Sequence, residues 1–184
     1  MERKGILKLN NSGMTLLEII VVIAILAIMA GGVSLSINVA FSRDASQCAS
    51  KLNDALYEAR MDSMSKPGAF YLEIRMESGE YVAVINDGTN DVYSEKLSEN
   101  GKISSITCAL NGNVTSISDV STVKIVFDKS KGNVKEYNGV GFSTDGASGT
   151  NMDGQIIFTV KQSRGDRESA VTLVTSTGKH KAGN

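Results

Sequence analysis

The 184-residue chain has no tryptophan, one proline, one histidine and two cysteines, and each shortage excludes something. Zinc sites use several cysteine or histidine ligands at short spacing, whereas Cys48 and Cys108 stand far apart and His180 is the only histidine. A lone histidine near the end of a chain also cannot anchor a Ser/His or Cys/His mechanism in a buried cleft. We therefore expect no metal, no cofactor and no catalytic residues, and predict that the protein is not an enzyme.

The chain also has no large excess of positive or negative charge. The 19 lysines and arginines nearly balance the 20 aspartates and glutamates, so the formal net charge is −1. Contact with nucleic acid would therefore need a local basic patch rather than a polycationic domain. The single proline, the absence of tryptophan and the 18 glycines favour a β-rich domain with many glycine turns. The length allows one such domain plus an N-terminal helix.

The most prominent feature present is an apolar stretch from Met14 to Val33. Its 20 residues would form an α-helix of about 30 Å, the thickness of a bilayer's hydrocarbon core. Glu18 is the only charged residue in the stretch. A carboxylate at membrane depth costs roughly 2.5–3.5 kcal/mol, so it is expected to have a partner. Basic residues precede the stretch, which favours a cytoplasmic leader and a C-terminal domain on the other side of the membrane.

The segment Ser12-Gly13-Met14-Thr15-Leu16-Leu17-Glu18, followed by the apolar run, resembles the type III signal of type IV pilins and of the pseudopilins of type II secretion and DNA-uptake machines. The resemblance implies that a prepilin peptidase cuts between Gly13 and Met14, and that the new amine of Met14 is methylated. It also implies that Glu18 meets the Met14 ammonium of a neighbouring subunit during assembly. Opposite charges attract strongly at low dielectric, and each is costly alone. Met14 departs from the phenylalanine that is usual at this position.

Two other interpretations of the N-terminus stay open. An ordinary secretory signal would be cleaved near Ala30-Gly31-Gly32, but Glu18 would then lie inside an apolar core where such signals avoid charge. A simple signal anchor would leave the Gly-x-x-x-x-Glu spacing as a coincidence.

Beyond Val33, the apolar residues are confined to one helical face until Lys66-Pro67-Gly68 ends the pattern. The residues of this stripe are Phe41, Ala45, Cys48, Leu52, Ala55, Leu56 and Ala59. We expect one helix of roughly 75 Å over residues 14–64, which Gly31 and Gly32 could loosen. The predicted parts are a leader (1–13), a transmembrane or filament-core helix (14–33), an amphipathic helix (34–65) and a β-rich pilin domain (69–184).

From residue 69 onward the apolar residues alternate with polar ones, as they do in half-buried strands. Strands are predicted at 70–76, 81–86, 92–97, 102–110, 122–127, 155–161 and 170–176, with a polar connection between 110 and 121. The predicted fold class is α+β, with a long N-terminal helix packed against an antiparallel β-sheet domain. Cys48 of the amphipathic helix and Cys108 of the β-rich domain either form a disulfide or remain two buried thiols; their spacing does not decide between these.

The C-terminal part is similar to the end of H-type pseudopilins and fimbrial minor pilins, the GspH/FimT-like group. The similarity lies in Gly141-Phe142-Ser143-Thr144-Asp145-Gly146 and in a last alternating strand that ends with Thr177-Gly178-Lys179, where lysine replaces the group's usual arginine. In some members the basic tail contributes to DNA uptake, which implies DNA contact by Lys179, His180 and Lys181. The alternative is a frayed, solvated terminus.

These observations predict a structural subunit of a type IV pilus, type II secretion or DNA-uptake filament, as a minor pilin or pseudopilin. The partners implied by the resemblance are other pilin subunits, a prepilin peptidase, a membrane platform protein with its assembly ATPase, and membrane lipid before assembly. The expected location is the inner membrane, crossed once, and then a periplasmic or extracellular filament. The alternative is a filament-tip module that binds DNA or a secreted substrate through the basic tail.

Overall fold

The computed structural model describes residues 15–41, 43–138, 140–143, 150–151, 154–165 and 167–183, and of residues 30–41, 140–143 and 150–151 it describes the backbone alone. The chain divides into a short unit, Met1–Ala40, and a larger unit, Phe41–Asn184. The predicted leader, with Gly13 at its end, lies outside the described residues, as does Met14.

Two helices occupy the region where the sequence predicts one: α1 (Leu16–Phe41) and α2 (Asp44–Ser65). The backbone of α1 continues through Gly31 and Gly32, so the predicted loosening is not at the glycines. Arg43 lies in a turn before α2, and its carbonyl oxygen accepts the N–H of Gln47 at 2.8 Å. The boundary separates an apolar helix from one whose apolar residues lie on a single face.

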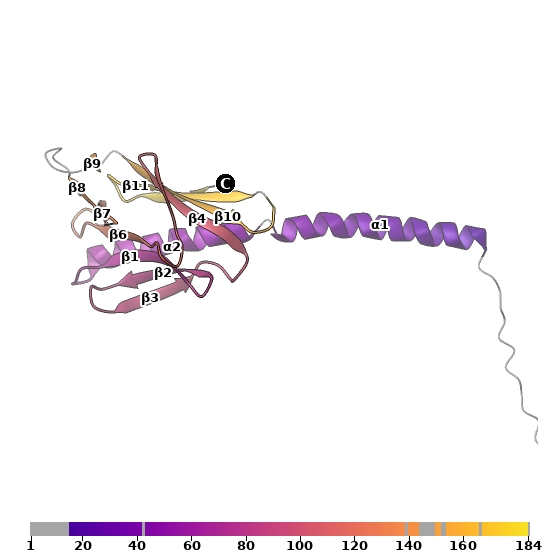
Figure 1. Ribbon diagram of the computed structural model, residues 1–184, viewed down its shortest axis with the longest axis horizontal. Coiled ribbons are helices and arrows are strands. Elements are labelled where there is room, and N and C mark those ends of the chain that lie inside the picture. The colour runs from indigo at the N-terminus through magenta and orange to yellow at the C-terminus, as the bar shows by residue number, and fades with distance from the viewer. Residues whose placement is uncertain are drawn as a thin grey trace, which may run out of the picture. The chain divides into compact units, whose positions relative to one another are not determined.

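The strands form two sheets within the larger unit (Figure 1). The seven-stranded sheet has the order β3-β2-β1-β6-β7-β8-β9, and the five-stranded sheet has the order β12-β11-β10-β4-β5. Neighbouring strands are antiparallel except for β8 and β9, which are parallel. The bounds are β1 (Tyr71–Glu77), β2 (Glu80–Asn86), β3 (Asp91–Lys96), β4 (Ile103–Leu110), β5 (Asn113–Ser116), β6 (Val123–Phe127), β7 (Val134–Tyr137), β8 (Val140–Ser143), β9 (Thr150–Asn151), β10 (Gln155–Gln162), β11 (Glu168–Val174) and β12 (His180–Gly183).

The predicted stripe of α2 forms the centre of the core. Of its members whose side chains are described, all are buried: Ala45, Cys48, Leu52, Ala55, Leu56 and Ala59. The helix contacts β1, β2 and β6 of one sheet and β10, β11 and β12 of the other. Each fully buried leucine side chain contributes roughly 1.5–3 kcal/mol, and the alanines between them let both sheets approach the helix closely. The predicted α+β class is confirmed.

Besides β8 and β9, three short strands lie outside the predicted ones: β5, β7 and β12. β5 falls in the stretch expected to be a polar connection, and β12 falls in the tail whose alternative interpretation was a frayed terminus. Each has only four residues, too few for an alternating pattern to stand out. Such strands depend on a neighbour that is already in place, with β4 holding β5, β6 holding β7 and β11 holding β12.

Arg60 of α2 connects the two sheets at one end of the helix. Its Nε donates to the Gly132 carbonyl oxygen at 2.8 Å, in the turn between β6 and β7, and its Nη2 donates to the Thr177 carbonyl oxygen at 3.2 Å, before β12. The N–H of Val134 donates to the carbonyl oxygen of Thr175 at 2.9 Å in the same region. The turn that leads into β12 is therefore tied to α2 and to the other sheet.

Gly178 lies at this junction, and substituting it tests how closely the junction is packed. Its φ is +65°, and a Cβ there would overlap the Gly132 carbonyl oxygen; Gly101 has a φ of +76° but open space around its Cβ position. Gly101→Ala should therefore lose about 1–2 kcal/mol from the left-handed backbone alone, and Gly178→Ala should lose a further 1–3 kcal/mol or so from steric overlap. Denaturant unfolding of both variants measures the difference, and equal losses would contradict the close packing of the junction.

Candidate functional site

The first turn of α1 is closed by Thr15 and contains Glu18. The N–H of Glu18 donates to the Thr15 side-chain oxygen at 3.3 Å and lies 3.0 Å from the Thr15 carbonyl oxygen. Thr15 is thus the N-cap, and Thr15-x-x-Glu18 has the spacing of a capping box. Glu18 also lies near the positive end of the helix dipole, which stabilises a carboxylate. The sequence contains this signal, but sequence reasoning assigned Glu18 only an intersubunit role.

The apolar side chains of α1 that are described, from Leu16 to Met29, are exposed. Every residue from Thr15 to Met29 is exposed, Leu16 to 76 %, and Glu18 is the only charged one among them. A helix that is apolar on all sides is stable only when other apolar material surrounds it. Among the described residues, no helix meets the combined length and hydropathy needed to cross a membrane.

The cysteines are separate, buried thiols, so the disulfide alternative is not the state seen in the structure. Burial raises the pKa of Cys48 and of Cys108 to about 12 each, against smaller opposing effects of Lys51 and of a hydrogen bond from Tyr137. The Tyr137 hydroxyl donates that bond to the Cys108 sulfur at 3.2 Å. A thiol with so high a pKa is almost entirely protonated at neutral pH and is a poor nucleophile.

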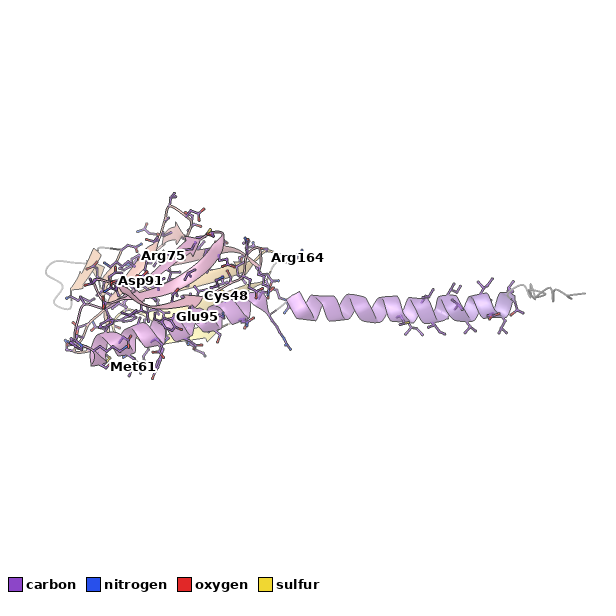
Figure 2. All side chains as sticks on the ribbon, turned by 90° about the horizontal axis from the view of Figure 1, so that it is seen from below. Cys48, Met61, Arg75, Asp91, Glu95 and Arg164 are labelled. Atoms are coloured by element: carbon purple, nitrogen blue, oxygen red, sulfur yellow. The ribbon has the colours of Figure 1, made fainter. Side chains whose placement is uncertain are left out.

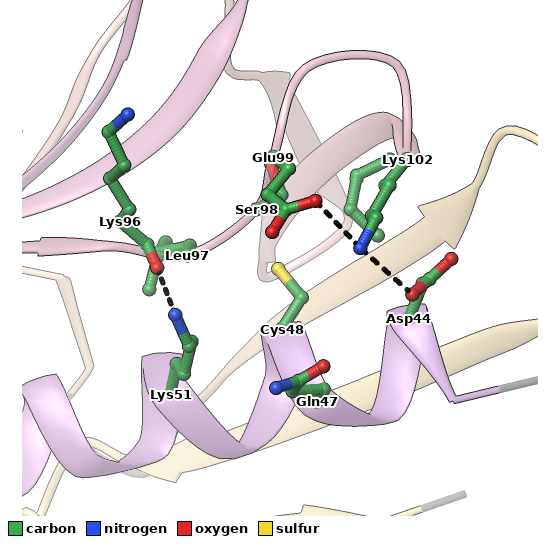
Figure 3. Close-up of a pocket in the computed structure, with 10 residues that line it drawn as sticks. Asp44, Gln47, Cys48, Lys51, Lys96, Leu97, Ser98, Glu99 and Lys102 are labelled. Carbon is green, nitrogen blue, oxygen red and sulfur yellow. Dashed lines mark hydrogen bonds and ion pairs between the residues drawn. The ribbon is translucent and has the colours of Figure 1, made fainter.

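Cys48 lines a cavity of about 70 Å³ between α2 and the connection from β3 to β4 (Figure 3). Lys51 Nζ closes one side by donating to the Lys96 carbonyl oxygen at 2.6 Å. Lys102 Nζ closes the other side, 2.8 Å from Glu99 and 3.9 Å from Asp44. The volume suits about two water molecules. The charges form a closed local network, with no arrangement suited to catalysis.

The C-terminal residues predicted to contact DNA lie in β12 or directly before it. Their side chains are on two different faces of the strand. Lys179 and Lys181 are exposed, whereas His180 is half-buried on the side of α2. The His180 and Tyr57 rings meet edge to face, with their centroids 6.4 Å apart. The two lysines are therefore the exposed charged groups of this tail, while the His180 ring packs against Tyr57 of α2.

A groove of about 620 Å³ lies beside these lysines on the outer face of β11 and β12. Ala170, Thr172 and Val174 lie along it, and residues 179–181 and Gly183 complete its lining, which includes no carboxylate. It is much larger than the cavity beside Cys48. Sequence reasoning could not find it, because it depends on the pairing of β12 with β11.

Comparison with known families decides the nature of the N-terminal segment. The family model for the prokaryotic N-terminal methylation motif matches residues 8–34. The chain carries the N-terminal motif of type IV prepilins. The predicted resemblance is confirmed for this segment. No curated protein and no solved structure matches the chain.

The prepilin motif places the exposed α1, Thr15 and Glu18 in a single functional segment. It supports a pilin-like subunit that is processed as a prepilin and assembles with other pilin subunits, and it points to anchoring in the inner membrane before assembly. It points to a structural role rather than a catalytic one. In the described part of the chain, no group of three or more His, Cys, Asp or Glu side chains is arranged to hold a metal ion.

The position of His180 predicts a pH dependence of β12. Burial lowers the pKa of His180 below its ordinary value of 6.5, the nearby Arg60 lowers it further, and the Gly178 carbonyl and Asp54 oppose these effects. The neutral ring therefore favours the docked strand. The contribution of His180 to stability is full above pH 6.5, falls as the pH drops below that value, and levels off below the folded pKa.

We expect amide hydrogen exchange in residues 179–183 to be less protected at pH 5.5 than at pH 7.5, after correction for intrinsic exchange rates. The variant His180→Gln is the control, since a neutral amide has no such transition. A pH effect of the same size in that variant would assign it to other groups.

Proposed function

We propose that the chain is a structural subunit, a minor pilin or pseudopilin, of a type IV pilus, type II secretion or DNA-uptake filament. The observation that carries the proposal is the prepilin motif at residues 8–34, together with the exposed apolar side chains from Leu16 to Met29 of the helix within it. A soluble protein rarely leaves such a surface uncovered. Lipid would cover it before assembly, and the helices of neighbouring subunits would cover it in the filament.

In this proposal the peptidase hydrolyses the peptide bond between Gly13 and Met14, and the new amine is methylated. Cleavage removes the basic leader and leaves the amine four residues before Glu18. The ammonium of one subunit then pairs with Glu18 of another inside the apolar bundle, where an unpaired charge costs several kcal/mol. The pair sets the register between subunits, because a shifted helix would leave both charges unpaired.

Removal of α1 from lipid would expose its apolar surface, at roughly 25 cal/mol per Å². Assembly therefore requires a source of energy. A platform protein in the membrane and an assembly ATPase are the partners we propose for that step. The domain of residues 69–184 would remain outside the inner membrane and form the outer part of the filament.

Mass analysis of the purified native N-terminus tests the proposed processing. We expect the mature chain to begin with methylated Met14. The distinction is clear, because the two other interpretations predict an N-terminus near Gly31 or an uncut leader. Either of those results would contradict the filament proposal.

Two variants separate the proposed pairing of Glu18 from its local role at the helix start. Glu18→Gln keeps the size of the side chain and the capping-box pattern but removes the charge. It should leave cleavage intact and reduce filament incorporation by roughly tenfold or more, which corresponds to a lost pair energy of about 1.4 kcal/mol.

Thr15→Ala is the matched control, because it removes the side-chain acceptor of the Glu18 N–H and leaves the charge unchanged. Its incorporation, measured as the ratio of filament-bound to membrane-bound chain, should stay close to that of the native chain. Normal incorporation of Glu18→Gln, or an equal defect in Thr15→Ala, would refute the pairing.

A second candidate function is a filament-tip module that binds DNA or a secreted substrate through its C-terminus. The exposure of Lys179 and Lys181 beside the groove favours a binding role for this edge. Two lysines displace few counterions from DNA, so such binding would be weak, strongly salt-dependent and independent of sequence. His180 is turned toward α2 and would not take part.

A further inference from the structure

The two sheets end in edge strands on opposite sides of α2. β3 is an outer strand of the seven-stranded sheet, and β12 is an outer strand of the five-stranded sheet. Figure 1 shows β3 and the yellow C-terminal strands on either side of the helix. The larger unit therefore presents two different lateral edges.

The β12 edge is basic and hollowed. Its groove contains Lys179 and Lys181 but no carboxylate, and the small side chains of Ala170, Thr172 and Val174 line it. No ion pair is found for either lysine within the described residues. This edge suits a partner that offers a bulky apolar side chain flanked by negative charge.

The β3 edge carries a bulky aromatic side chain with negative charge near it. Tyr93 of β3 is 38 % exposed and lies near three carboxylates, Asp54 and Glu58 of α2 and Glu95 of β3. The Tyr93 hydroxyl donates to Glu95 Oε2 at 3.5 Å. Burial raises the pKa of Tyr93, and the charges of Glu95, Glu58 and Asp54 raise it further.

Part of that negative charge is available to a partner. Glu95 lies beside α2 and pairs with Lys51 at 3.0 Å (Figure 2). Asp54 and Glu58 are exposed and have no ion pair in the described part of the chain. Glu58 and Asp54 thus lie near an exposed aromatic side chain on the β3 side of α2, and Asp54 also acts on His180 across the exposed face of α2.

We propose that the acidic edge of one copy, with Asp54, Glu58 and Tyr93, docks on the basic groove of a second copy, between Lys179 and Lys181. The inference rests on the proposed filament function and names a lateral contact of the domain. Tyr93 fills the groove and supplies most of the binding, as buried aromatic anchors do at interfaces. The charged pairs around it select the partner and orient it.

The symmetry of this contact fits a filament. Because the two surfaces differ and lie on opposite sides of α2, each copy that docks leaves a free edge of each kind. A contact of this head-to-tail type repeats in one direction and produces an open helical assembly unless the rotation happens to close a ring. A contact between two identical edges would instead bring like charges together and stop at a dimer.

Cysteine cross-linking of the full chain tests the contact. We expect the double variant Glu58→Cys/Lys181→Cys to form a ladder of disulfide-linked dimers, trimers and larger species in the membrane fraction under mild oxidation. Cys48 and Cys108 stay in place, since both are buried. Each single variant should remain monomeric. Glu58→Cys/Lys135→Cys is the matched control, with its second cysteine at an exposed lysine of β7.

The charges are tested by reversal in the same assay. Glu58→Cys and Lys181→Cys are placed on two separate chains made in the same cells, and the dimer between them is measured. Lys179→Glu in the chain with Lys181→Cys should reduce that dimer by roughly tenfold, corresponding to about 1.4 kcal/mol. Asp54→Lys in the chain with Glu58→Cys should restore much of it, because the reversed charges attract again.

Several results would overturn the contact. A ladder equal to that of the Lys135 control would show random collision, and a dimer from either single variant would show contact between identical edges. Loss of salt-sensitive DNA binding in Lys179→Glu with an unchanged cross-link would assign the groove to DNA. A mature N-terminus at Met14 without a ladder would refute this contact and leave the filament function standing.

Discussion

The larger unit depends on the packing of one helix face against two sheets at once. The buried positions of α2 alternate between alanine and larger residues, and Ala49, Ala55 and Ala59 have no exposed surface. A larger side chain at any of them would push one sheet away from the helix, because protein interiors are packed too closely to absorb added volume. The separation of the two sheets, and so of β3 from β12, follows from these small residues.

The N-terminal unit, unlike α2, has its described apolar side chains exposed rather than packed in a core. Its described side chains from Leu16 to Met29 are exposed, so its stability depends on material outside the domain. Glu18 has a role at the start of its own helix and a proposed role between subunits. Its backbone N–H bonds to Thr15 and closes the first turn of α1. The proposed intersubunit pair would use the carboxylate, which that local bond leaves free. The local cap and the proposed intermolecular pair are therefore compatible.

Local pattern was enough to predict much of this fold. The stripe of α2 and the hairpin of β1 and β2 follow from periodicity over a few turns or residues, and the prepilin motif is a contiguous segment. The break near Arg43 and the strands β5, β7 and β12 carry no comparable signal, because they depend on which neighbours are already in place. Whether the two cysteines are bonded, and whether a groove forms beside Lys181, also depend on which segments the fold brings together. Thr15 is different, since its capping pattern was present in the sequence and was missed.

The ordering of the C-terminus changes what its charges can do. A frayed basic tail offers positive charge over a wide volume and discriminates little between partners. In β12, Leu173 faces His180, and Thr172 faces Lys181. The strand therefore turns its histidine toward α2 and its lysine toward the groove. The side chain that anchors the strand and the side chain available to a partner are adjacent in sequence and point in opposite directions, as alternation in a strand requires. The pairing of β12 with β11 therefore places both side chains at once. A partner that needs Lys181 at a fixed position also depends on the contact between His180 and Tyr57.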